Sequence, residues 1–223
     1  MEGSRIGRRL AAILAADIAG YSRLMEENES ATVDALRAHQ AVVLPLIETH
    51  AGRIQDTAGD GILAEFRSVF EAVICALAIQ RKMAERNADE PPTRQMQYRI
   101  GISLGDVVYD GARVYGEGVN LAARLEGVAE PGGICVSEDA FRQISGKIDV
   151  EFVDLGQPSL KNIKRPVRAY RAVLSSASGS SMSTSALPLP DKPSVAVIPF
   201  AVMTADPGCP QGRHPGPHHG TAP

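Results

Sequence analysis

The stretch LAAILAADIAGYS, residues 10–22, decides the fold that this sequence predicts. Residues 10–16 are all apolar, which is typical of a central strand covered on both faces. Asp17 interrupts this run, and the residues after it read as a loop that enters a helix. We therefore expect a buried strand that ends on a carboxylate at the edge of a sheet.

Strand-like and helix-like periods alternate along the rest of the chain. Ser68 and Glu71 form a capping box that predicts the start of a helix, and residues 98–104 alternate apolar with polar or small side chains as a strand does. The other expected elements are helices through residues 33–47, 70–77 and 120–128 and strands at 62–66, 134–136, 150–155 and 167–173. Their order, βαββαβ followed by a smaller αββ elaboration, predicts an α+β fold. Its ferredoxin-like core would carry helices on one face of a mostly antiparallel sheet.

Composition excludes several classes of protein. The chain has 223 residues, with 23 Lys and Arg against 26 Asp and Glu, and this weakly acidic balance argues against a nucleic-acid or membrane partner. No apolar run approaches the roughly 20 residues that cross a bilayer. Three widely spaced cysteines without a CxxC motif favour a reducing compartment, so we expect a cytoplasmic protein. The sequence also lacks a P-loop motif, which excludes P-loop NTPases.

The chain divides into three regions by composition. Residues 1–174 mix charge with strand and helix periods, and we expect them to form one domain. Residues 175–191 have seven serines in their first eleven positions and read as a flexible linker. Residues 192–223 open on the strand-like KPSVAVIPF and end in a stretch rich in Pro and Gly. We expect this last region to be the truncated remnant of a second region, mostly disordered.

Two aspartates are candidate metal ligands. Asp17 ends the first strand, and Asp60 lies in TAGDG, residues 57–61, between two strand-like runs. Taken singly, each has a simpler interpretation, because Asp is common at helix caps and Asp-Gly is a strong hairpin signal. If the first strand lies beside this hairpin, the two carboxylates are neighbours and repel each other unless a cation holds them. Mg²⁺ accepts one or two carboxylates and leaves positions for substrate phosphates.

Two further segments carry candidate substrate contacts. Gly20, Tyr21 and Ser22 follow Asp17 in a loop whose backbone N–H groups could hold phosphate. Asn120 and Arg124 are four residues apart and so share one helix face. An amide and a guanidinium that point the same way suit a ribose oxygen and a phosphoryl oxygen, although a solvated helix face would also explain them.

Taken together, these residues resemble the catalytic domain of the class III adenylate/guanylate cyclases, over roughly residues 7–174. The matching stretches, in order and with matching spacing, are AADIAGYSRL, GRIQDTAGDGILAEF, YRIGISLGDVV, YGEGVNLAARLEGVAEPGGICVS and SLKNIKRPVRAYR. The chain looks most like the soluble bacterial type, which carries a C-terminal extension. The stretch KPSVAVIPF resembles the opening of that extension. The resemblance implies the nucleotide cyclase fold and a head-to-tail homodimer with its active sites between the subunits.

The resemblance also implies a role for each candidate residue. Asp17, Asp60 and the backbone carbonyl of Ile18 would hold two Mg²⁺ (or Mn²⁺) ions. From the partner chain, Asn120 would orient the ribose and Arg124 would stabilise the transition state. Lys161 would bind phosphate, together with the nucleotide-binding loop of Gly20, Tyr21 and Ser22. The implied reaction is attack of the ribose 3′-oxygen on the α-phosphorus, which releases pyrophosphate and closes the cyclic nucleotide.

Three positions depart from the family's pattern. The lysine and aspartate that normally select adenine are replaced by Asp56 and Arg113, and the usual glycine after Lys161 is Asn162. Asp56 could accept from the adenine amino group while Arg113 donates to N1, and guanine would be matched at least as well. We expect ATP as the substrate. GTP is the alternative, and a catalytically degenerate dimerisation or sensor module is a further one.

Overall fold

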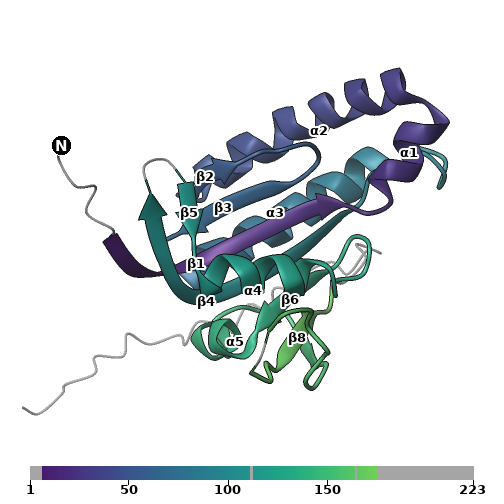
Figure 1. Cartoon of the computed structure of the whole chain (residues 1–223). Helices are drawn as coiled ribbons and strands as arrows, with labels where there is room; N and C mark the ends of the chain where they lie inside the picture. Colours follow the sequence, from purple (N-terminus) through teal and green to yellow (C-terminus); the bar gives the residue numbers. More distant parts are fainter. Residues whose placement is uncertain (1–6, 111–112, 164, 175–223) are drawn as a thin grey trace, which may run out of the picture. The chain divides into compact units, whose positions relative to one another are not determined.

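The computed structural model describes residues 7–110, 113–163 and 165–174 (Figure 1). The predicted linker at 175–191 and the predicted remnant at 192–223 lie outside the described residues and stay predictions. None of the helices in the described part of the chain is long and apolar enough to cross a bilayer.

The expected order of elements is present. The first half contains β1 (Gly7–Ile18), α1 (Tyr21–Glu27), α2 (Glu29–Thr49), β2 (Arg53–Asp56), β3 (Ile62–Phe66), α3 (Val69–Asn87) and β4 (Tyr98–Asp110). The second half contains β5 (Arg113–Tyr115), α4 (Glu117–Glu126), β6 (Ile134–Ser137), α5 (Glu138–Ile144), β7 (Phe152–Asp154) and β8 (Ala169–Ala172). The short elements α5 and β5 were not predicted, and α1 already begins at Tyr21, so the expectation that Tyr21 and Ser22 lie in a loop is wrong.

One mixed sheet carries the fold, in the order β2-β3-β1-β4-β6-β8-β7 with β5 paired to β4. β1 pairs antiparallel with β3 on one side and β4 on the other, and β4 runs parallel to β6. The strands β2, β3, β1 and β4 with α2 and α3 make the expected ferredoxin-like βαββαβ unit. The α+β prediction is therefore confirmed.

Helices cover both faces of the sheet, so the expectation that they lie on one face is wrong. In β1, Leu14 and Ile18 belong to the cluster under α2 and α3, whereas Ile13 belongs to a separate cluster with Ala122 of α4. Figure 1 shows α4 in front of β4, with α3 running behind β1. The alternation of β1 thus places apolar side chains on both sides, as a doubly covered strand requires.

Small residues in β4 explain why α4 packs on the second face. Ile100 and Ile102 point into the α3 cluster, so Gly101, Ser103 and Gly105 lie on the opposite side. A Cβ atom at Gly101 would overlap the carbonyl oxygen of Ala122 and the amide nitrogen of Glu126. The Ser103 hydroxyl donates to the Gly118 carbonyl at 2.7 Å. The strand therefore offers a groove into which α4 fits closely.

The start of α3 is only partly as predicted. Ser68 is the N-cap, and its hydroxyl accepts a hydrogen bond from the Phe70 amide at 3.2 Å. Glu71 does not close the expected capping box, because its carboxylate lies 3.7 Å from Nδ1 of His50 at the end of α2. The N-cap alone therefore fixes the start of the helix.

Candidate active site

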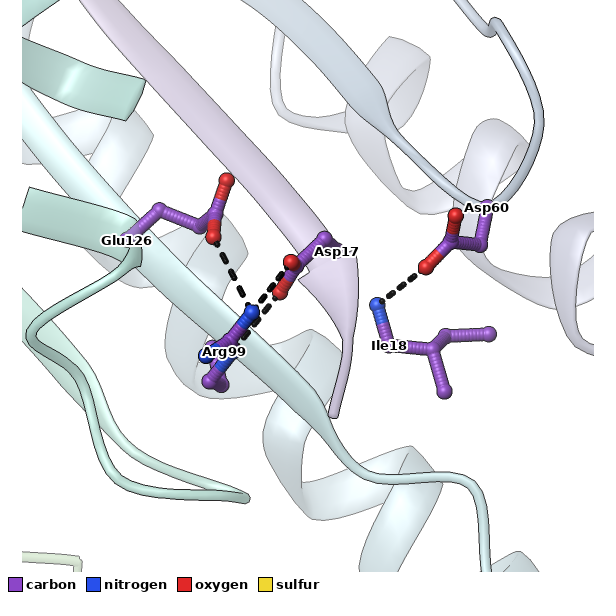
Figure 2. A network of polar contacts seen from close by, with 5 residues as sticks. All are labelled: Asp17, Ile18, Asp60, Arg99 and Glu126. Atoms are coloured by element: carbon purple, nitrogen blue, oxygen red, sulfur yellow. Dashed lines mark hydrogen bonds and ion pairs between the residues drawn. The ribbon is translucent and has the colours of Figure 1, made fainter. Parts of the chain in front are cut away.

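The two candidate metal aspartates lie close together. Asp17 is near the end of β1, and Asp60 sits in the turn between β2 and β3. Because Ala16 of β1 pairs with Ile62 of β3, this turn lies beside the end of β1. The Asp60 carboxylate accepts a hydrogen bond from the Ile18 amide at 3.1 Å (Figure 2). The expected neighbourhood of strand end and hairpin is therefore present.

Arg99 joins this pair, although the sequence did not single it out. It lies on β4 directly opposite Asp17. Its Nε donates to Asp17 Oδ1 at 2.9 Å, and its Nη2 forms an ion pair with Asp17 Oδ2. Glu126, the last residue of α4, places Oε1 3.6 Å from the same Nη2. Figure 2 shows the guanidinium between the two carboxylates.

Negative charge is in excess in this cluster. The carboxylates of Asp17 and Glu126, whose side chains are 25% and 16% exposed, contact the single guanidinium of Arg99, and the Asp60 carboxylate lies beyond Asp17 on the Ile18 amide. Burial raises the pKa of Glu126 to about 8, and the negative charge of Asp17 adds to the shift. The hydrogen bond with Asp17 raises the pKa of Arg99. At neutral pH Glu126 is therefore mostly protonated, and the carboxylates of Asp17 and Asp60 still outnumber the guanidinium of Arg99, so the cluster favours a further cation.

The residues present fit Mg²⁺ as that cation. The described residues contain no group of three or more His, Cys, Asp or Glu side chains that could hold a metal alone. Mg²⁺ does not need one, since it takes one or two carboxylates and keeps its other positions for water and substrate phosphates. Asp17 and Asp60, with the carbonyl of Ile18 as a third oxygen donor, supply such a partial set.

The segment expected to bind the nucleotide follows β1. Gly20, with φ 69, precedes α1, which begins at Tyr21 and includes Ser22.

Arg124 and Lys161 are brought together on another part of the molecule. Arg124 lies on α4, and its Nε donates to the backbone carbonyl of Lys161 at 3.0 Å. Asn120 is one turn earlier on the same helix face and is exposed. Asn162 has φ 63, a left-handed conformation that asparagine tolerates better than most residues. Its presence in place of glycine therefore keeps the turn that carries Lys161.

The two positions expected to contact the base lie near each other. Asp56 ends β2 and Arg113 begins β5. A hydrogen bond with Tyr115 raises the pKa of Arg113, and the nearby charge of Asp56 adds a smaller contribution. Within the described residues, no ion pair joins the two side chains. Arg113 therefore contacts Tyr115 rather than forming an ion pair with Asp56.

Comparison with known proteins identifies the family. Residues 8–173 match the model of the adenylate and guanylate cyclase catalytic domain. The chain belongs to this family. It is 44% identical over 211 residues to the putative adenylate cyclase 3 of Rhizobium meliloti (strain 1021), a match that covers 93% of this chain and 36% of that protein. The chain therefore spans about a third of that relative's length.

Solved structures agree with the family. A crystal structure of an adenylate/guanylate cyclase/hydrolase from Silicibacter pomeroyi is 44% identical and superposes with a TM-score of 0.72, covering 76% of this chain and 99% of that one. A guanylyl cyclase crystal structure is 26% identical with a TM-score of 0.64, covering 75% of this chain and 93% of that one. The resemblance seen in the sequence and the nucleotide cyclase fold are thereby confirmed. The names of these relatives include both adenylate and guanylate cyclases.

Proposed function

We propose that this chain converts ATP to 3′,5′-cyclic AMP and pyrophosphate at a site that two copies of the chain build together. The direction of two side chains on α4 carries the proposal. Glu126 contacts Arg99 beside Asp17, whereas Arg124 contacts the Lys161 turn. Positions two residues apart on a helix face directions about 200° apart. Because Glu126 points toward the aspartates, Arg124 points away from the aspartates of its own chain. A second copy, related by a twofold axis, can bring Arg124 to them.

Each residue has a distinct part in the proposed reaction. When bound, two Mg²⁺ or Mn²⁺ ions supply Lewis acidity that lowers the pKa of the ribose 3′-hydroxyl. Asp17 and Asp60 hold the cation side of the site, and Arg99 exchanges Asp17 for a phosphate oxygen of the incoming triphosphate. From the other chain, Asn120 orients the ribose and Lys161 binds phosphate. Arg124 neutralises charge on the α-phosphoryl group, a role in which one donor contributes about 3 kcal/mol.

The proposed compartment is the cytoplasm. Cys75 and Cys135 are buried free thiols, and burial raises the pKa of Cys135 to about 11. Protonated, buried thiols of this kind serve as small apolar side chains and need no oxidising environment. This supports the reducing compartment that the cysteine spacing predicts.

Mixing two inactive variants tests the shared site. Asp17→Ala breaks the aspartate half of a site and Arg124→Ala breaks the other half, so their heterodimer should regain about one intact site. Asp17→Ala mixed with Asp60→Ala is the matched control, because both changes damage the same half and no intact site can form. Cyclic nucleotide is measured by mass analysis. Failure of the first mixture to regain activity would contradict the shared site.

GTP is a second candidate substrate, favoured by Asp56 and Arg113. The Asp56 carboxylate can accept from both N1–H and the N2 amino group of guanine, and Arg113 can donate to O6. The 44% identity to a putative adenylate cyclase supports ATP. Comparing kcat/KM for ATP and GTP in wild type and in Asp56→Lys/Arg113→Asp decides between them, since buried polar mismatches discriminate strongly. Cyclisation of neither nucleotide with Mg²⁺ or Mn²⁺ would favour a non-catalytic dimerisation or sensor module.

A further inference from the structure

The loop that carries Lys161 is attached to α4 by three separate contacts. Leu160 packs in the apolar cluster that contains Leu121 and Leu125 of α4. The backbone carbonyl of Lys161 accepts the hydrogen bond from Arg124 Nε at 3.0 Å. Beyond the turn, Arg165 Nε lies 2.9 Å from the carboxylate of Glu117, the first residue of α4. One apolar contact, one hydrogen bond and one ion pair therefore follow the length of the helix.

The backbone of this turn sets the direction of the Lys161 carbonyl. The Ile163 amide donates to the Leu160 carbonyl at 3.2 Å, which closes a four-residue turn. Asn162, the third residue, has φ 63, while Lys161 has no positive φ. These features define a type II turn. Types I and II differ by a flip of the central peptide, whose carbonyl belongs to Lys161. A left-handed Asn162 therefore turns that carbonyl toward Arg124.

Among the described residues, Arg124 is held through its Nε, and its terminal nitrogens form no hydrogen bond. A guanidinium carries one N–H on Nε and four on its two terminal nitrogens. The Lys161 carbonyl uses the Nε–H. The terminal nitrogens keep the paired geometry that matches phosphoryl oxygens.

We propose that Asn162 is a positioning residue for the cyclase reaction. Its left-handed conformation holds the Lys161 carbonyl on Arg124 Nε, and this contact aims the guanidinium at the α-phosphoryl group. The inference rests on the proposed function, because it assigns Asn162 a part in delivering Arg124 to the site on the partner chain.

Substitutions at Asn162 separate backbone conformation from side-chain chemistry. Valine disfavours φ > 0 and would turn the peptide over, so Asn162→Val should lower kcat by about tenfold to a hundredfold, as misplaced catalytic groups do. Glycine adopts φ > 0 freely, so the separate variant Asn162→Gly should keep kcat at the wild-type value. Ala51→Val is the matched control, since Ala51 has φ 56 in the turn between α2 and β2. It should lower the thermal midpoint and leave kcat unchanged.

A double-mutant cycle identifies the residue through which Asn162 acts. Lysine at position 124 has no Nε–H to donate while its charge reaches the substrate, so the carbonyl loses its effect in Arg124→Lys. Adding Asn162→Val to Arg124→Lys should therefore change kcat by less than about twofold. If the two effects multiply while the wild type is active, Asn162 acts elsewhere and this inference alone is overturned. A wild type that cyclises neither nucleotide overturns the proposed function and the inference with it.

Discussion

The two faces of the sheet differ in what they bury. The face under α2, α3 and α5 carries a continuous apolar cluster that includes Leu14, Phe66 and Ile79. The side covered by α4 has two much smaller clusters, one around Ile13 and one around Leu121 and Leu125, and α4 contacts mainly β4 and β1. Most of the hydrophobic stabilisation therefore comes from the first face. The second face keeps strand surface available for polar groups and, in our proposal, for a second copy of the chain.

Charged networks mark both ends of the second face. Toward the end of β1, Asp17 contacts Arg99. Toward its beginning, Arg9 forms an ion pair with the buried Glu65 of β3, and Glu65 Oε2 also accepts from Gln55 Nε2 at 2.8 Å. Ionised side chains are costly inside an apolar core and need partners. These two networks on the second face, and the large apolar cluster on the first, distinguish the face that carries the proposed chemistry from the face that stabilises the fold.

The largest expected effect on stability comes from truncating the first face. Phe66 is 1% exposed and packs beneath the turn at Gly52. Phe66→Ala should lower the free energy of unfolding by about 3–5 kcal/mol, because it removes buried area and leaves a cavity. Leu10→Ala is the control, since Leu10 is 64% exposed and should change stability little. Equilibrium urea unfolding measures both, and equal losses would contradict the assignment of stability to this face.

A smaller effect on stability, but one that reaches the site, is expected at Gly101. Any Cβ there overlaps the backbone of α4 at Ala122 and Glu126, so Gly101→Ala must push the helix away from the sheet. Overpacking of this kind costs about 1–3 kcal/mol. Because α4 carries Asn120 and Arg124, kcat should fall as well. Gly7→Ala is the matched control in β1, where a Cβ meets nothing within 4 Å. An unchanged kcat in Gly101→Ala would contradict the idea that activity depends on the position of α4.

The sequence predicted what depends on local pattern. The period of β1, the Asp60 hairpin and the spacing of Asn120 and Arg124 are all readable within a few residues. Arg99 and Glu126 were missed, because the contact of Arg99 with Asp17 depends on the register between β1 and β4. Register is a property of the assembled sheet, so no local sequence pattern predicts it.

A signal for the position of α4 was present but not used. Gly101, Ser103 and Gly105 place small side chains at every second position of one strand. Such a row permits close approach of another backbone, as glycine in a strand often does. Interpreted this way, the alternation predicts a helix on that face. The departure at Asn162 is explained only by its φ of 63, which sequence does not give.

A more modest effect is expected from the network at the beginning of the second face. Arg9 is half exposed, whereas Glu65 is 4% exposed and keeps Gln55 as a second partner. Arg9→Met should therefore lower stability by about 1–2 kcal/mol, the cost of a buried acceptor that loses one partner. In Arg9→Met/Glu65→Leu no unpaired charge is left, so stability should recover in part. Additive losses in urea unfolding would contradict a direct interaction between the two side chains.

The smallest effect concerns a polar residue that lies against the first face. His39 of α2 is 8% exposed, its Nδ1 donates to the Ala35 carbonyl at 2.8 Å, and its buried Nε2 has no hydrogen-bond partner among the described residues. Burial lowers the pKa of His39 from 6.5. The hydrogen bond with the Ala35 carbonyl opposes this shift, the charge of Arg86 adds to it, and the charge of Glu90 opposes it. The folded protein therefore resists protonation of this imidazole, which the unfolded chain accepts.

The sign of the resulting pH dependence follows. Above the unfolded pKa both states carry a neutral imidazole and His39 contributes no slope. As the pH falls below 6.5, the unfolded state binds a proton that His39 in the folded state does not, so the free energy of unfolding decreases until the folded pKa is reached. We expect a loss of less than about 1.4 kcal/mol for each pH unit.

His39→Leu tests this pH dependence. It should flatten the dependence of the free energy of unfolding on pH, measured with urea between pH 6.5 and 5, relative to wild type. His50→Gln, a change near the exposed Glu71 carboxylate, serves as the comparison and should leave the His39 slope in place. Identical slopes in wild type and His39→Leu would assign the acid sensitivity of the fold to its carboxylates instead.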